Sequence, residues 1–112
     1  AKISTSAPFS QRVRACIRSM LPVGGLTATT VAAQFRVSER TLRRRLREEA
    51  TSYQEVLNEV RVELARHYLT KEKRGIVEIA LILGFSDQSA FTKAFRRWTG
   101  QTPADFARGN SS

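Results

Sequence analysis

Residues 79–103 read IALILGFSDQSAFTKAFRRWTGQTP, and this stretch decides the fold. Its apolar start predicts a short helix, followed by a turn at Gly84 and a second helix that Ser86 and Asp87 open. At helical spacing, the inward face of this second helix consists of Ala90, Phe91, Ala94, Phe95 and Trp98. Its outward face consists of Gln88, Ser89, Thr92, Lys93, Arg96 and Arg97. A helix, a tight turn and a polar second helix form the shape that enters a DNA major groove.

A looser copy of this layout begins near Thr30. Ala32 in this copy corresponds to Ala80, and a small side chain there lets two helices approach closely. Val37 corresponds to Phe85, whose side chain fills the gap between the helices. The residues that then start and anchor the second helix are Ser38, Leu42 and Leu46 in one copy and Ser86, Phe91 and Phe95 in the other. Two such copies in one short chain make sequence-specific DNA binding the leading hypothesis.

The rest of the chain also shows helical periodicity and no strand alternation, so we expect an all-α fold of seven helices. Besides the helix after Asp87, the expected helices cover residues 11–21, a segment capped by Thr27 or Thr29 that ends at 35, 38–49, 53–71, 77–83 and a segment after Pro103. The expected organisation is residues 1–8 as a linker or cloning remnant, 9–51 as a first helix-turn-helix lobe, 52–73 as a linker helix, 74–108 as a second lobe and 109–112 as a tail. The linker helix would span roughly 28 Å, and major grooves on one DNA face repeat about every 34 Å.

The charge balance favours a polyanionic partner. The 112 residues include 19 Lys and Arg against 10 Asp and Glu, a net charge of +9. Such a charge suits nucleic acid, although it also suits an anionic membrane surface. No apolar run is long enough to span a membrane, and the lone Cys16 fits a reducing cytoplasm. We therefore expect a cytoplasmic, nucleoid-associated protein without membrane contact.

Enzymatic chemistry is not expected. The single histidine, His67, has no second ligand at metal spacing, and His67 and Cys16 lie too far apart in sequence to suggest a catalytic pair. No glycine-rich phosphate loop occurs. The sequence therefore predicts no catalytic residues, no metal site and no cofactor.

These motifs resemble the DNA-binding domain of the AraC/XylS family of bacterial transcription regulators. Residues 79–103 follow the second helix-turn-helix of that family and its closing Gly-x-x-Pro, and the pattern Ser38-x-x-x-Leu42-x-Arg44-x-Leu46-Arg47 matches the first recognition helix more loosely. The resemblance runs from about residue 11 to 106. It implies seven helices in two helix-turn-helix lobes joined by a long helix, and sequence-specific binding of double-stranded DNA in two successive major grooves to regulate transcription. It also implies an upstream effector or dimerisation domain absent from this chain, and we expect RNA polymerase as a partner of the intact protein.

The segment from Arg36 to Arg47 holds six arginines against one acid, Glu39. Arginine donates two hydrogen bonds to guanine, the commonest base-specific contact. By the resemblance, the base-contacting residues are Arg40, Arg43 and Arg44, with Arg44 the first choice. In the second lobe they are Gln88, Ser89, Thr92 and Lys93. The residues expected at phosphates are Arg36, Ser38, Arg47, Ser86, Arg96 and Arg97.

Several alternatives remain open at this point. An arginine-rich helix face is often only solvated, and Arg45 stands where the family places an apolar residue, so its stem could cover the core instead. Arg36 stands where the turn often has glycine, which means either a strained left-handed residue or a helical variant of the turn. Trp98 is expected in the core rather than under a base. The alternative function is a basic, sequence-nonspecific DNA-binding or nucleoid-like protein.

Overall fold

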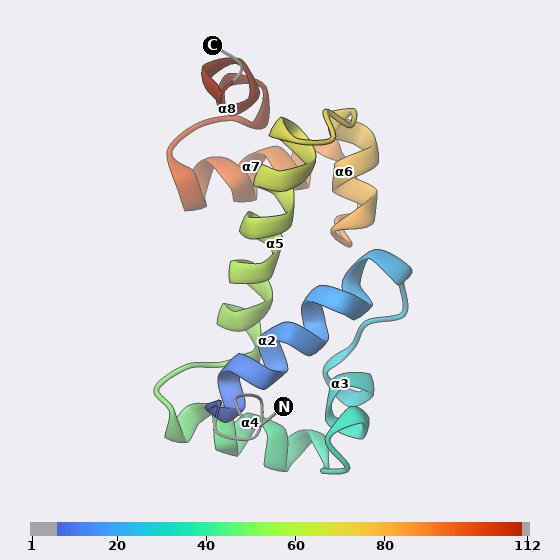
Figure 1. Cartoon of the computed structure of the whole chain (residues 1–112), viewed down its shortest axis with the longest axis vertical. Helices are drawn as coiled ribbons and strands as arrows, with labels where there is room; N and C mark the ends of the chain where they lie inside the picture. Colours follow the sequence, from blue (N-terminus) through green and yellow to red (C-terminus); the bar gives the residue numbers. More distant parts are fainter. Residues whose placement is uncertain (1–6, 111–112) are drawn as a thin grey trace. The chain divides into compact units, whose positions relative to one another are not determined.

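The computed structural model describes residues 7–110 (Figure 1). Within this range the chain forms seven α-helices, one 3-10 helix and no strand, so the expected all-α fold is confirmed. The elements are α2 (Phe9–Met20), η1 (Leu21–Val23), α3 (Ala28–Gln34), α4 (Glu39–Glu48), α5 (Tyr53–Thr70), α6 (Ile76–Ile82), α7 (Gln88–Thr99) and α8 (Pro103–Asn110). Most of the expected linker at 1–8 and the last two residues of the expected tail at 109–112 lie outside the described residues.

The chain divides into two compact units, Ala1–Val60 and Arg61–Ser112. The boundary falls inside α5, so each unit includes one half of that helix. Each unit has a hydrophobic core of its own, and each is described separately below.

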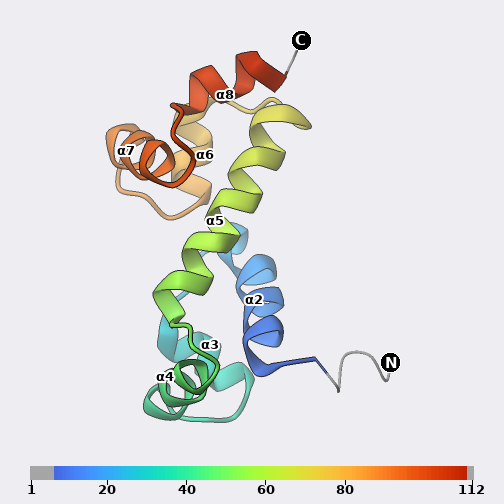
Figure 2. The same ribbon diagram turned by 90° about the vertical axis from the view of Figure 1, so that its left-hand side faces the viewer.

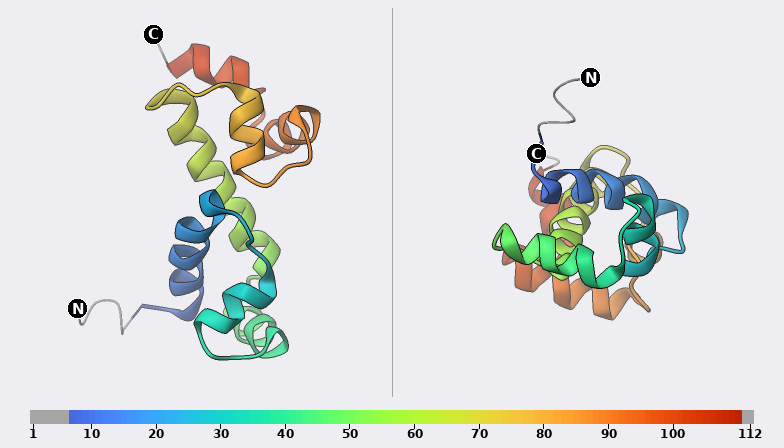
Figure 3. Two further views of the ribbon diagram at one scale, coloured as in Figure 1. Left: turned by 90° about the vertical axis from the view of Figure 1, so that its right-hand side faces the viewer. Right: turned by 90° about the horizontal axis from the view of Figure 1, so that it is seen from below.

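In the first unit, α2, α3 and α4 pack against one another (Figure 3). The side chains at the centre of this small bundle are fully shielded from solvent: Val13, Ile17, Val31, Leu42 and Leu46. At its edge the rings of Phe9 and Phe35 meet edge to face, with centroids 5.2 Å apart. The apolar face of α4 is therefore fixed against α2 and α3, and this leaves its arginine-rich face outward.

In the second unit, α7 packs against both α6 and α8 (Figure 2). The centre consists of Ile79, Leu83, Phe91 and Phe95, none of which is exposed to solvent. The Phe95 ring also contacts the ring of Phe106 from α8, at a centroid separation of 5.5 Å. The inward face of α7 is narrower than the sequence predicts.

Two residues of that predicted stripe are only half-buried. Ala90 and Trp98 lie at the margins of the inward face of α7. The Trp98 ring still contacts the ring of Phe85, with centroids 6.1 Å apart, so the tryptophan packs beside the turn rather than in the centre of the core.

Hydrogen bonds from side chains define where the helices begin. Ser38 accepts the amide of Thr41 at 3.0 Å and caps α4, as predicted. Of the two candidate caps for α3, Thr27 serves, since its hydroxyl accepts the amide of Thr30 at 3.0 Å. The expectation that Ser86 helps open the next helix is wrong. It lies outside α7, whose cap is Asp87.

The first helix also differs from its predicted bounds. It begins at Phe9 rather than at residue 11, and Pro22 does not end the helical region at once, because it lies within η1. Proline is tolerated in the first turn of a helix, where its missing amide would have no partner in any case. None of the helices between residues 7 and 110 has the length and apolar content that a membrane-spanning segment needs.

Candidate nucleic-acid interface

The turn between α3 and α4 closes in the same way as the turn between α6 and α7. In the first, the amide of Val37 donates to the carbonyl of Ala32 at 3.1 Å. In the second, the amide of Phe85 donates to the carbonyl of Ala80 at 2.9 Å. Both helices thus end in the motif that places one residue in the left-handed region. The two segments are structural copies of one helix-turn-helix design.

Arg36 is that left-handed residue in the first turn, with φ 58°. The corresponding residue in the second turn is Gly84, with φ 87°. The left-handed alternative for Arg36 is therefore confirmed, and the helical variant of the turn is wrong. A side chain with a Cβ carries strain in this region that glycine does not. The side chain of Arg36 is exposed to solvent.

The outward face of α4 presents four exposed arginines: Arg40, Arg43, Arg44 and Arg47. They lie opposite Leu42 and Leu46, whose side chains are completely buried. The open alternative for Arg45 is settled by its surroundings, because its guanidinium carbon lies 3.9 Å from the centroid of the Phe9 ring. A cation stacked on an aromatic ring in this way belongs to the packing of the unit rather than to the outward face.

The four outward arginines differ in how firmly they are held. Arg43 donates from Nε to Oε2 of Glu39 at 2.9 Å, and its Nη2 lies 2.9 Å from the same oxygen. Arg44 has only a loose contact with Glu48, at 3.7 Å. Within residues 7–110, no carboxylate pairs with Arg40 or Arg47. The exposed face of α4 therefore combines one guanidinium in a close ion pair with three that have a long carboxylate contact or none within the described residues.

The outward face of α7 carries fewer charges. Gln88, Ser89 and Lys93 are exposed and Thr92 is half-buried, and these four side chains occupy the positions expected to meet bases. The two cations at the far end of the helix, Arg96 and Arg97, are exposed as well. Ser86 is exposed in the loop just before the cap, where its hydroxyl is open to solvent. The helix itself contains no acidic residue. The surface is suited to hydrogen bonding with neutral and anionic groups.

A model of the helix-turn-helix domain family matches residues 31–109, which include the second copy of the motif and all of the first copy except the start of α3. The chain belongs to the AraC/XylS family of helix-turn-helix proteins.

Known members of the family resemble the chain over most of its length. The ornithine utilization regulator of Pseudomonas aeruginosa is 49% identical over 75 residues, which are 67% of this chain and 22% of that protein. The crystal structure of the transcriptional regulator CdpR from the same species matches with a TM-score of 0.80 and 44% identity. The matched region is 89% of this chain and 31% of the CdpR chain. The DNA-binding domain of AdpA, crystallised with a target DNA, has a TM-score of 0.76 and 28% identity over 93% of both chains. The chain thus spans less than a third of the length of the first two relatives.

The AraC/XylS sequence pattern does not identify the partners of the arginines. The hydroxyl of Thr29 on α3 donates to Oε1 of Glu39 at 3.0 Å, and the ring of Tyr53 lies 5.7 Å from the guanidinium carbon of Arg43. The sequence predicted none of these contacts, and it offered Thr29 only as an alternative cap for α3. One signal was present, since Glu39 and Arg43 are four residues apart and face each other on a helix.

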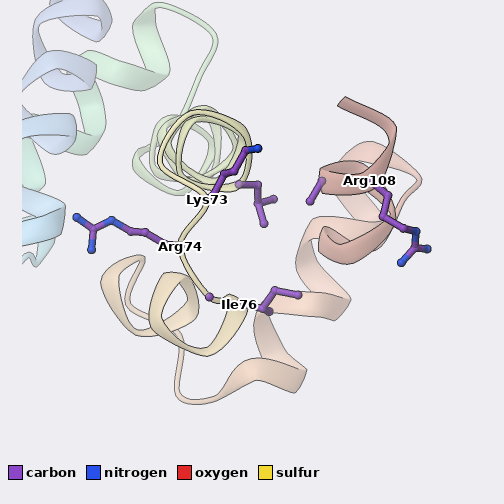
Figure 4. Close-up of a pocket in the computed structure, with 7 residues that line it drawn as sticks. Lys73, Arg74, Ile76 and Arg108 are labelled. Carbon is purple, nitrogen blue, oxygen red and sulfur yellow. The ribbon is translucent and has the colours of Figure 1, made fainter. Parts of the chain in front are cut away.

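A hollow of about 520 Å³ lies in the second unit, away from the outward face of α7. Its floor is apolar, formed by residues such as Leu69, Ile76 and Ala107. Figure 4 shows the side chains of Arg74 and Arg108 extending to opposite sides, and Arg74 is paired with Glu72 at 2.7 Å. The charges around this hollow therefore do not converge on one point, and we assign it no part in the interface.

Proposed function

We propose that this AraC/XylS domain is the DNA-reading part of a transcription regulator, which binds double-stranded DNA sequence-specifically in two successive major grooves. The observation that carries the proposal is the pair of helix-turn-helix copies, each with an exposed, hydrogen-bonding face on its second helix. The crystallised complex of AdpA with a target DNA supports it, because that domain resembles this chain over nearly its whole length.

Helix α4 is proposed to read guanine. Arg40, Arg43 and Arg44 project from its outward face, and each guanidinium can donate two hydrogen bonds to O6 and N7. Arg36 and Arg47 neutralise phosphates, and the start of the helix at Ser38 offers backbone amides to a phosphate oxygen. Phosphate contacts set the position of the helix, and base contacts select the sequence.

Helix α7 is proposed to read a second site with weaker electrostatic attraction. Gln88 can pair with adenine through N6 and N7, and the methyl group of Thr92 can contact thymine. The remaining candidates for base contact are Ser89 and Lys93. The candidates for phosphate contact are Ser86, Arg96 and Arg97. Because α7 offers fewer cations than α4, its share of the affinity is expected to be smaller.

The intact protein is proposed to contain an upstream effector or dimerisation domain and to contact RNA polymerase in the cytoplasm. The lengths of the relatives support the first part, since this chain spans only 22% of the ornithine utilization regulator.

Selection of bound sequences from a pool of random duplexes tests the proposal. Enrichment of two half-sites with centres about 10 base pairs apart is expected, since that spacing is one turn of DNA. The alternative function, nonspecific binding through the net charge of +9, predicts binding without an enriched motif. An unenriched pool would overturn the proposal.

A further inference from the structure

We infer that Glu39 is a positioning residue that aims Arg43 at one guanine, and that Thr29 holds Glu39 in place for this purpose. This inference rests on the proposed function. It assigns a role in specificity to the single acid on an otherwise basic stretch of chain.

Both carboxylate oxygens of Glu39 are engaged. Oε1 accepts the hydroxyl of Thr29 at 3.0 Å, and Oε2 accepts Nε of Arg43 at 2.9 Å. Thr29 belongs to α3, whose apolar side is fixed in the core by Val31 and Ala32. The position of the carboxylate therefore depends on a neighbouring helix as well as on α4.

The contact leaves the reading edge of Arg43 available. A guanidinium presents five N–H groups, and Glu39 engages the side formed by Nε and Nη2. Nη1 and the second hydrogen of Nη2 form the end of the fork, and these two groups can donate to O6 and N7 of guanine. The ring of Tyr53, 5.7 Å from the guanidinium carbon, limits the movement of the same group from another direction.

The neighbouring arginines lack this arrangement. Arg44 is only 3.7 Å from Glu48, and no hydroxyl from another helix contacts Glu48 within the described residues. Within the same residues, Arg40 has no carboxylate partner at all. Of the three candidate readers of guanine on α4, only Arg43 is thus held by a close ion pair in the absence of DNA. A side chain that is already ordered loses less conformational freedom on binding.

A contribution to folding stability does not by itself explain the contacts of Glu39 with Thr29 and Arg43. The side chains of Glu39 and Arg43 are 43% and 48% exposed, and ion pairs this exposed add little to folding. A carboxylate beside the DNA phosphates would also lower the affinity for any sequence. The hydroxyl of Thr29 and then the guanidinium of Arg43 lower the pKa of Glu39, so the carboxylate is ionised at neutral pH. We expect an ionised Glu39 to increase the ratio of the affinity for the selected DNA site to the affinity for other sequences.

Glu39→Gln and Glu48→Gln form a matched pair, because each removes one negative charge from α4 at the same spacing from an arginine. The affinity of the two variants and of the parent chain is measured on the selected duplex and on a panel with each base pair replaced in turn. Arg43→Ala identifies the base pair that Arg43 contacts. At that base pair, we expect Glu39→Gln to reduce the ratio of the affinities for the selected and the substituted duplex about two- to tenfold. This is the loss in affinity expected when one side chain must be ordered on binding. We expect Glu48→Gln to leave discrimination at that pair unchanged, while both variants bind scrambled DNA more tightly.

Two further measurements exclude a merely structural effect. Thr29→Val keeps every charge and is expected to reduce discrimination at the same base pair, with thermal unfolding as the check that the variant is folded. In an Arg43→Ala background, Glu39→Gln is expected to cause no further loss of discrimination at that base pair, since the two residues act as one unit there. Equal effects of Glu39→Gln and Glu48→Gln at this base pair would overturn the inference while leaving DNA reading intact. A parent chain that discriminates at no base pair would overturn the proposed function itself.

Discussion

Arg36 and Gly84 occupy the same position in the two helix-turn-helix copies, and both are left-handed, with φ 58° and 87°. Each follows the first helix of its copy. Arg36 lies two residues before Ser38, the cap of α4, and Gly84 lies three residues before Asp87, the cap of α7. The turn requires this backbone conformation in both copies, but only one copy meets the requirement with glycine. The first copy therefore retains strain at a residue whose charge is proposed to meet a phosphate.

Replacement of Arg36 by glycine is expected to stabilise the first unit. The gain in the free energy of unfolding should be about 0.5–1 kcal/mol, because the strain of a Cβ at positive φ outweighs the greater freedom of glycine in the unfolded chain. The same variant should bind DNA more weakly, since a phosphate contact is lost. Urea unfolding and duplex titration on one preparation measure both effects.

Ala50→Gly provides the matched control for that variant. Ala50 has φ 62° and ends α4 through the same kind of turn, with the amide of Thr51 donating to the carbonyl of Leu46 at 3.1 Å. The gain in stability should be similar, and DNA affinity should not change, because no charge is removed. A loss of stability in both glycine variants would show that strain at positive φ is not what these positions share.

Substitutions at Asp87 and at its neighbour Ser86 test which of the two residues caps α7. Asp87 accepts the amide of Ala90 at 2.8 Å, so Asp87→Ala should lower the free energy of unfolding by about 0.5–2 kcal/mol, whereas Asp87→Asn should retain most of it. Ser86→Ala should leave stability unchanged and weaken binding to all duplexes slightly. Thermal unfolding ranks the three variants, and a larger effect at Ser86 than at Asp87 would reverse the assignment of the cap.

The capping of α7 shows why the sequence predicts some features better than others. Helical periodicity places Leu42, Leu46, Phe91 and Phe95 inward, and all four are completely buried. Ser86 and Asp87 are both good capping residues, and neither composition nor spacing chooses between them. The backbone conformation does, because Asp87 is extended and its carboxylate reaches Ala90.

Helical periodicity could not predict which side chains of different helices contact one another. The stacking of Arg45 on Phe9 joins residues 36 positions apart, and the hydrogen bond from Thr29 to Glu39 depends on how α3 approaches α4. Spacing on one helix could indicate the pair of Glu39 and Arg43, but not the third partner from another helix. The contacts proposed for DNA remain predictions from the family pattern and the exposed faces.

Because of Glu49, the first unit is expected to become less stable as the pH falls. The carboxylate of Glu49 accepts hydrogen bonds from the amide of Ser10 at 3.2 Å and from the Ser10 hydroxyl at 2.6 Å. It thereby binds a free amide in the first turn of α2, where Pro8 provides no side-chain cap. The Ser10 hydroxyl is the main cause that lowers the pKa of Glu49. A lowered pKa gives stability that is present above the ordinary carboxyl range and is lost as the pH falls through the value in the folded protein.

Comparison of the parent chain with Glu49→Ala across pH tests this expectation. The parent should unfold at a higher temperature at neutral pH, and the difference should shrink as the solution is acidified below the ordinary glutamate range. A difference that stays constant down to low pH would mean that Glu49 acts by packing rather than by its charge.

Arg44 and Arg47 are expected to respond differently to alanine substitution. Arg44→Ala should cost about 1–3 kcal/mol on the selected site and relax the preference at one base pair. Arg47→Ala should weaken every duplex alike and reduce the dependence on salt by about one phosphate contact. If Arg44→Ala also behaves as a uniform loss across duplexes, Arg44 contacts phosphate and not a base.

The central claim, sequence-specific reading by this domain, is tested most directly by the affinity for the selected duplex and for a scrambled duplex across a salt series. Contacts to about six to eight phosphates predict a log–log slope near −5 to −7 for both duplexes. The account predicts an affinity gap on the order of 10³ or more between them that persists as salt rises. Two parallel lines without a gap would contradict it and would leave only a basic, nonspecific DNA-binding protein.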